Sequence, residues 1–420
     1  MRNVTKRGIL LLLALMTLAL CAGCGGASVD NGGNGVNIDP GLGAKTLTDI
    51  GNNYYYGNDG MERSYEKARA YYEAALEKDS AAAARMLGAL YENGYGVEQD
   101  YEQARQYYEQ AAETGNAAAL NTLAALYESG RGVERDYEKA FAYYEQSAAT
   151  GNAGAIIKLG SFYENGRGVE RDYEKARQYY EQAAETGSAT ALNSLAALYE
   201  NGRGVEQDYE KALAYYEQSA ATGNAGAIIK LGSFYENGRG VERDYEKARQ
   251  YYEQAAETGN VTALNALAAL YESGRGVEQN YEQARTYYEQ SAATGNVRAI
   301  IKLGSFYENG RGVERDYEKA RQYYEQAAET GNATALNALA ALYENGRGVE
   351  QNYERARAYY EQSAEQGNAA ALVKLGAFYE NGLGVEQNYE TALAYYEQAA
   401  EKDNKAAIQK VTEIREILNG

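Results

Sequence analysis

A single unit repeats along most of this chain of 420 residues. One clear copy, at 153–187, reads AGAIIKLGSFYENGRGVERDYEKARQYYEQAAETG. The tyrosine that opens the second half of the unit recurs every 36 residues, at Tyr65, Tyr101, Tyr137, Tyr173, Tyr209, Tyr245, Tyr281, Tyr317, Tyr353 and Tyr389. A strict period of this length is typical of stacked repeat proteins, so the sequence predicts an array of similar units.

Each unit contains two patterns of helical spacing. In the first half, Leu159 and Tyr163 lie four residues apart, on one face of a helix. In the second half, Tyr173, Ala176 and Tyr180 also fall on one face. One such helix pair buries too little apolar surface to fold alone, but stacked pairs share a continuous core.

The residues between the patterns predict where the helices start and stop. Asp172 precedes the second helix and can cap its free N–H groups. Gly166 and Gly168, in the loop between the helices, permit positive φ and a tight reversal. Gly187 is expected to end the second helix in the left-handed conformation. Gly160 is small enough to let the two helices approach closely.

The repeated pattern resembles the Sel-one-like repeat (SLR) family, which is related to the tetratricopeptide repeats. The matching residues in this copy are Ala155, Leu159, Gly160, Tyr163, Gly166, Gly168, Val169, Asp172, Ala176, Tyr180, Ala183, Ala184 and Gly187. The chain contains no Trp, and the usual Trp-Tyr pair reads Tyr-Tyr, which is expected to alter packing and not fold. The resemblance implies an all-α fold, an α-solenoid forming a right-handed superhelix of about ten helix-turn-helix repeats.

Residues 1–24 read as an export signal, with a basic start followed by an apolar run too short to span a bilayer comfortably. The sequence Cys21-Ala22-Gly23-Cys24 resembles a bacterial lipobox, which implies that cleavage leaves Cys24 as the lipidated first residue. Cys21 stands where Leu is usual. An ordinary cleaved signal and an uncleaved anchor are the alternatives.

The rest of the chain divides into three parts. Residues 25–43 form a flexible Gly- and Asn-rich tether, and residues 44–404 hold the array of about ten repeats. Residues 405–420 are expected to form a C-terminal capping helix that covers the last repeat with one apolar face. That face comprises Ile408, Val411, Ile414 and Ile417.

Composition excludes several classes of function. The formal charge of −19 argues against nucleic acid, whose phosphates require stripes of Lys and Arg. The chain has no His, and both cysteines lie in the signal, so neither a zinc site built from His and Cys nor a His general base is expected in the repeats. No cofactor, metal or catalytic residue is predicted.

One enzymatic alternative comes from the resemblance alone, because some cysteine-rich SLR proteins are described as β-lactamase-like or penicillin-binding. A serine β-lactamase requires Ser-x-x-Lys together with Ser-Asp-Asn and Lys-Thr-Gly. Only the first occurs, from Ser64 to Lys67, and Ser64 occupies the helix-cap position of its repeat. We therefore keep a hydrolase as the weaker alternative.

Two series of polar residues are candidates for binding a peptide along the first helices, which line the concave surface in related solenoids. Regularly spaced donors along a groove suit the backbone or acidic side chains of an extended peptide. The alternative is that the lysines pair with neighbouring glutamates and keep the surface soluble. The candidates are Lys158, Lys230, Lys302 and Lys374 on every second repeat, with Asn121, Asn193, Asn265 and Asn337 between them.

A series of loop arginines is expected mainly to pair with glutamates of the next repeat. These are Arg131, Arg167, Arg203, Arg239, Arg275, Arg311 and Arg347. We therefore expect a scaffold for a protein or peptide partner, attached through its lipid to the membrane. The resemblance implies an outer-membrane lipoprotein of the bacterial cell envelope, facing the periplasm or the exterior. A secreted factor that binds host proteins is the alternative.

Overall fold

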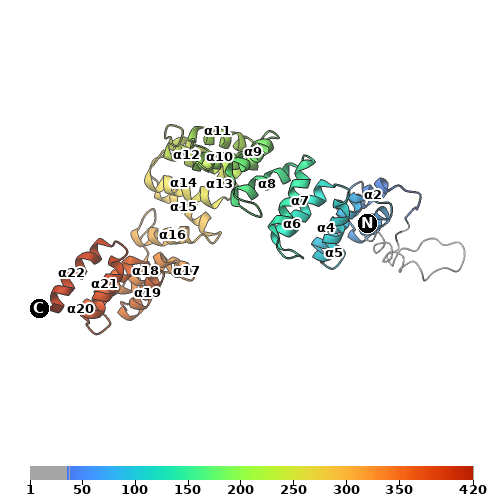
Figure 1. Cartoon of the computed structure of the whole chain (residues 1–420). Helices are drawn as coiled ribbons and strands as arrows, with labels where there is room; N and C mark the ends of the chain where they lie inside the picture. Colours follow the sequence, from blue (N-terminus) through green and yellow to red (C-terminus); the bar gives the residue numbers. More distant parts are fainter. Residues whose placement is uncertain (1–35, 37, 420) are drawn as a thin grey trace. The chain divides into compact units, whose positions relative to one another are not determined.

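The computed structural model describes residues 36 and 38–419, in which every regular element is a helix (Figure 1). The all-α prediction is thereby confirmed, while the signal at 1–24, Cys24 and most of the tether lie outside the described residues. The helices are α2 (Ala44–Tyr56), α3 (Tyr65–Leu76), α4 (Ala81–Asn93), α5 (Tyr101–Ala112), α6 (Ala117–Ser129), α7 (Tyr137–Ala149), α8 (Ala153–Asn165), α9 (Tyr173–Ala184), α10 (Ala189–Asn201), α11 (Tyr209–Ala221), α12 (Ala225–Asn237), α13 (Tyr245–Ala256), α14 (Val261–Ser273), α15 (Tyr281–Ala292), α16 (Val297–Asn309), α17 (Tyr317–Ala328), α18 (Ala333–Asn345), α19 (Tyr353–Glu365), α20 (Ala369–Asn381), α21 (Tyr389–Ala400) and α22 (Lys405–Asn419).

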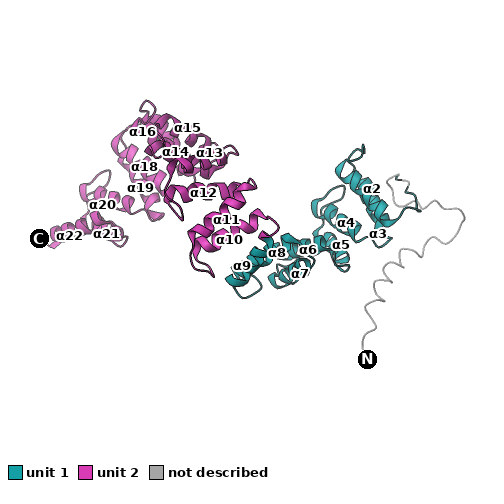
Figure 2. Cartoon of the chain, turned by 90° about the horizontal axis from the view of Figure 1, so that it is seen from above, with its two compact units in different colours: residues 1–183 teal, residues 184–420 magenta. Residues whose placement is uncertain are grey.

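The chain forms two compact units, which divide at the end of α9 (Figure 2). Unit 1 extends to residue 183, and unit 2 covers residues 184–420. Within each unit, an even-numbered helix opens each repeat and an odd-numbered helix closes it; we call these the first and second helices. In unit 2, the second helix α11 contacts both its own first helix α10 and the next first helix α12. This pairwise stacking is that of an α-solenoid, as predicted.

Helix starts follow the predicted caps. Asp172 Oδ1 accepts a hydrogen bond from the backbone N–H of Lys175 at 3.0 Å, which satisfies a free donor of α9. The loop glycines Gly166 and Gly168 have φ of 65° and 64°. Gly187 has the predicted left-handed conformation, at φ 77°, but α9 ends at Ala184, so Gly187 closes the turn that follows the helix. Residues 185–187 form this turn, and the first helix of the next repeat begins at Ala189.

The core of each repeat is a tyrosine ring from the second helix. In unit 2 these rings are buried at Tyr216, Tyr252, Tyr288, Tyr324, Tyr360 and Tyr396. A Cβ added to Gly232 of α12 would lie 2.6 Å from the Tyr252 ring, which is closer than real Cβ atoms approach. The small residue predicted at this position is therefore needed mainly to leave room for the tyrosine ring. Close contact between the helix backbones is the lesser reason.

Loop glycines join consecutive repeats. Gly240 has φ of 64°, and a Cβ there would lie 2.5 Å from the carbonyl carbon of Tyr209 in the preceding repeat. Any side chain at this position would meet main-chain atoms, which cannot rotate away. The loop of one repeat thus rests directly on the start of the preceding second helix.

The prediction for the last helix is wrong for two of its four residues. Ile414 of α22 is buried and Val411 is half-buried, but Ile408 and Ile417 are 50% and 52% exposed. In the repeat before, Leu372 packs against Ala399 of the following second helix. Ile408 occupies the corresponding position in α22, and no helix follows α22 in the described chain to cover it.

Candidate binding surface

The predicted lysines lie near the middle of first helices and reach back to the preceding repeat. Lys230 Nζ in α12 lies 2.9 Å from Glu200 Oε2, and Glu200 is the penultimate residue of α10. We call the glutamate at this position of each first helix its end glutamate. The corresponding lysine–glutamate pairs are Lys158–Glu128 at 2.9 Å, Lys302–Glu272 at 3.0 Å and Lys374–Glu344 at 2.9 Å.

Each end glutamate named above also accepts a hydrogen bond from the buried tyrosine of its own repeat. Tyr216 Oη donates to Glu200 Oε2 at 2.8 Å, and Tyr144 donates to Glu128 at the same distance. Burial, together with the neighbouring carboxylate, raises the pKa of Tyr216 well above its ordinary value. The phenol therefore remains the donor and the carboxylate the acceptor.

The loop arginines also contact end glutamates, but in the opposite direction from that predicted. Arg239 Nη1 lies 3.2 Å from Glu200 Oε1, so the arginine pairs with the preceding repeat and not the next one. Since the loop rests on the preceding second helix, the arginine side chain follows it there. The other recorded pairs are Arg167–Glu128 at 3.5 Å, Arg311–Glu272 at 3.4 Å and Arg347–Glu308 at 3.5 Å.

The predicted asparagines lie where consecutive first helices meet. Asn193 Nδ2 donates to Oδ1 of Asn224, the cap of the next first helix, at 2.8 Å. Asn265 makes the same contact with Asn296 at 3.3 Å. Within the described residues, a buried Oδ1 with no hydrogen-bond donor is found on every predicted asparagine, namely Asn121, Asn193, Asn265 and Asn337. Buried acceptors are normally paired, so these oxygens lack a hydrogen bond that such positions usually have.

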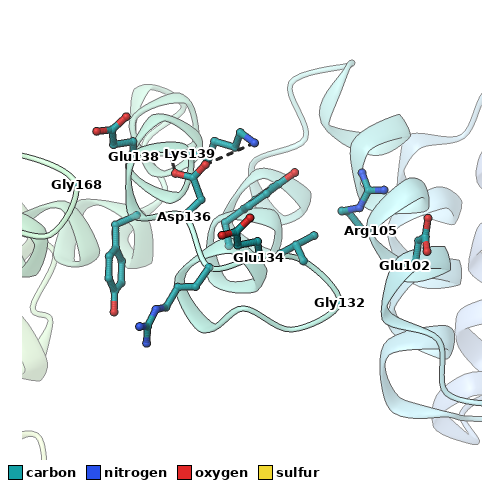
Figure 3. Close-up of a pocket in the computed structure, with 12 residues that line it drawn as sticks. Glu102, Arg105, Gly132, Glu134, Asp136, Glu138, Lys139 and Gly168 are labelled. Atoms are coloured by element: carbon teal, nitrogen blue, oxygen red, sulfur yellow. Dashed lines mark hydrogen bonds and ion pairs between the residues drawn. The ribbon is translucent and has the colours of Figure 1, made fainter.

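A hollow that we did not predict from the sequence lies at the start of second helices. In unit 1 it has a volume of about 780 Å³ between α5 and the start of α7. Figure 3 shows Glu102 and Arg105 on one side, with Asp136 and Lys139 on the other. Lys139 lies 3.5 Å from Asp136 and also covers the Tyr127 ring, so its charge is already engaged.

Similar hollows recur at 199–211 and 307–319. The sequence Asp-Tyr-x-Lys is present at each of them and could have been used to predict the hollows. The backbone N–H of Lys139 lowers the pKa of Asp136, as a helix cap does. Asp136 and Lys139 therefore satisfy one another at the start of the helix.

The metal-binding and serine-hydrolase patterns considered from the sequence concern residues that the structure describes. No cluster of three or more His, Cys, Asp or Glu side chains in this part of the chain is arranged to hold a metal ion. Ser64 Oγ accepts a hydrogen bond from the backbone N–H of Lys67 at 3.3 Å, which is a helix cap. The Lys67 ammonium lies over the Tyr54 ring. Ser-x-x-Lys is therefore explained by helix capping.

Comparison with known proteins identifies the repeat. The model of the Sel1 repeat matches ten consecutive segments, at 44–80, 81–116, 117–152, 153–188, 189–224, 225–260, 261–296, 297–332, 333–368 and 369–404. No curated protein matches the chain.

Two solved structures are similar over much of their length. One is c5321, a protective antigen present in uropathogenic Escherichia coli strains displaying an SLR fold; it is 30% identical, with a TM-score of 0.63, over 89% of this chain and 88% of that one. The other is a Sel1 repeat protein from Oxalobacter formigenes, 31% identical with a TM-score of 0.53, over 59% of this chain and 99% of that one.

Proposed function

Because the chain belongs to the Sel1 repeat family, whose scaffold is suited to protein–protein interaction, we propose that it is a non-catalytic scaffold for an extended segment of a protein partner. The segment lies along the first helices of the repeats. The observation that carries this proposal is the series of buried asparagine oxygens without a donor. Leaving such an acceptor unpaired costs free energy that an incoming N–H group recovers.

The asparagines and lysines have different roles in this proposal. Asn265 and Asn337 accept hydrogen bonds from the backbone of the partner, which gives affinity with little dependence on its sequence. Lys230, Lys302 and Lys374 are held by end glutamates, so they reach an acidic side chain only by exchanging one carboxylate for another. The lysines therefore contribute mainly to the shape of the surface.

A crosslinking pull-down from envelope extracts with the full chain tests the scaffold. We expect partners captured by the natural chain to be lost from the double variant Asn265→Ala/Asn337→Ala. They should be retained by Gln290→Ala, a change at an exposed position of the second helix α15. A variant with Lys230, Lys302 and Lys374 changed to Glu serves as a further control, which measures separately how much the lysines contribute to capture. Identical capture by all these chains would contradict the proposed surface.

The non-catalytic part of the proposal has a separate test. The purified mature chain should not hydrolyse nitrocefin, because Ser64 is engaged as a helix cap and the remaining β-lactamase motifs are absent from the sequence. Clear turnover would overturn it.

We also propose that the chain is exported and anchored in the bacterial envelope by lipid on Cys24. The support is the lipobox-like sequence after a basic and apolar segment. Among the helices of the described chain, none combines the length and hydropathy needed to cross a membrane. Radiolabelled palmitate should enter the natural chain and not Cys24→Ser, and incorporation that survives the substitution would refute the site. Cell fractionation separates an anchored protein from a secreted one.

A further inference from the structure

The end glutamates of unit 2 fall into two groups that differ in their cations. Glu200, Glu272 and Glu344 each bind a lysine from the next first helix, and Glu380 binds Lys410 of α22. Glu236, in α12, accepts a hydrogen bond from Tyr252 Oη at 2.8 Å, but within residues 38–419 it forms no ion pair with a lysine or arginine. Its loop arginine, Arg275, lies over the Tyr245 ring, 5.8 Å from the ring centre.

The missing cation has a direct structural cause. Lys230 and Lys302 occupy one position of the first helix, and in the repeat between them this position holds Ala266 of α14. Ala266 ends at its Cβ atom, so the place filled by a lysine side chain beside Glu200 and Glu272 has no ammonium group beside Glu236. The same substitution occurs at Ala338, and among the described residues Glu308 has one ion pair, with Arg347 at 3.5 Å.

The end glutamate is built to receive an ammonium group. At Glu272, Lys302 Nζ lies 3.1 Å from Oε1 and 3.0 Å from Oε2 while Tyr288 holds Oε2 from the other side. Glu236 has the equivalent tyrosine contact and is likewise partly buried. A partly buried carboxylate with a preset geometry binds a cation more strongly than an exposed one, because less solvent screens the pair.

We infer that a lysine side chain of the partner occupies the place beside Glu236 that Lys230 and Lys302 fill in the adjacent repeats, and that the bound segment is therefore basic. This inference rests on the proposed function and adds the chemistry of its partner. Asn265 immediately precedes Ala266 in α14, and its buried Oδ1 has no donor in the described chain, so the same helix carries both the vacant lysine position and an acceptor proposed for the partner's backbone.

The charge of the whole chain favours the same partner. A formal charge of −19 attracts basic segments and repels acidic ones at a distance. The lysine-filled glutamates on either side of Glu236 are already neutralised, so the attraction is concentrated at repeats that lack an internal lysine. A partner with basic residues that reach Glu236 and Glu308 fits this alternation.

Fluorescence anisotropy with a fluorescein-labelled peptide of alternating Lys and Ser residues tests the inference on the full chain. Ala266→Lys fills the site from within, and we expect it to weaken binding about fivefold, equivalent to about 1 kcal/mol. Gln290→Lys, in α15, adds the same charge on the second helix and should leave affinity nearly unchanged. A peptide of alternating Glu and Ser residues should not bind.

Two further variants keep the inference testable if Ala266→Lys does not fold. Glu236→Gln removes the charge and should also weaken binding of the lysine peptide. Lys374→Met should tighten it, because Glu344 then resembles Glu236: its tyrosine contact remains, and Leu383 stands where other repeats have the loop arginine.

Equal affinities for the natural chain, Ala266→Lys, Glu236→Gln and Lys374→Met would overturn the basic-segment inference, as would the absence of binding to the natural chain. The proposed scaffold fails on a different result, namely unchanged partner capture by Asn265→Ala/Asn337→Ala. The two failures are thus distinguishable.

Discussion

The repeat at 225–260 and the repeat at 261–296 have the same helices but pack their tyrosines differently. In the first, the Tyr252 ring lies against Gly232 of its own repeat and near Leu270 of the next. In the second, Tyr288 shares a cluster with Ala268 of its own repeat and Phe306 of the next, with the two rings 5.6 Å apart.

Where the first helix of a repeat carries the smaller Gly232, the next first helix carries Leu270. Where it carries the larger Ala268, the next first helix carries the larger Phe306. Both choices fill the core around an identical tyrosine. The same pairing is seen for Tyr216, whose ring lies 5.4 Å from Phe234. The unit of packing is therefore the two-repeat block, and this agrees with the sequence, where alternate copies are more alike than neighbours.

The largest expected effect tests what both kinds of repeat share. Burial raises the pKa of the core tyrosines Tyr216, Tyr252, Tyr288, Tyr324, Tyr360 and Tyr396 above the ordinary value near 10. Above about pH 10 the unfolded chain binds fewer protons than the folded chain, so stability is complete below that pH and falls as pH rises.

Above that pH, each such tyrosine lowers the free energy of unfolding by about 1.4 kcal/mol per pH unit, so stability falls steeply. Circular dichroism and tyrosinate absorbance during a titration from pH 8 to pH 12 check this prediction. Both signals should change together, whereas tyrosine ionisation without loss of helix would contradict it.

The difference between the repeats predicts the next effect. Gly232→Ala should destabilise unit 2 by about 2 kcal/mol, because the added Cβ overpacks the buried Tyr252 ring. Alanine otherwise favours a helix over glycine by about 1 kcal/mol, so a net loss distinguishes packing from propensity. Urea unfolding provides the measurement, with Ala269→Gly at an exposed position of α14 as control.

The end glutamates predict a smaller effect. Lys374→Met should cost about 1 kcal/mol, because it leaves the largely buried Glu344 without a cation. Lys230→Met should cost less, because Arg239 still lies within 3.2 Å of Glu200. Equal losses in thermal unfolding would show that the loop arginine does not compensate.

The smallest effect concerns serines that replace alanine in alternate second helices. Ser219 Oγ donates to the carbonyl oxygen of Ala189 at 3.1 Å, so Ser219→Ala should cost up to about 1 kcal/mol. Ser291 Oγ is buried without a partner in the described chain, so Ser291→Ala should be neutral or slightly stabilising. Hydrogen exchange of the adjacent helices checks both, and a larger loss at Ser291 would contradict the comparison.

Much of the architecture was predictable because its causes are local. Helix spacing, cap residues such as Asp172 and the positive φ of Gly166 depend on a few consecutive residues. The resemblance to the Sel-one-like repeats and the all-α solenoid are confirmed. Membrane anchoring through Cys24 and peptide binding by the asparagines and lysines remain predictions.

By itself, the sequence determined the period, the two helices of each repeat and the turns between them, since neighbouring residues decide these. Only the tertiary structure decided which groups meet across repeats. It pairs Arg239 with a preceding glutamate, leaves Glu236 without an ion pair in the described part of the chain and exposes Ile408. Contacts between repeats join residues about 30 to 40 positions apart. Their partners depend on how one helix pair stacks on the next, and a pattern of a few neighbouring residues does not determine this stacking.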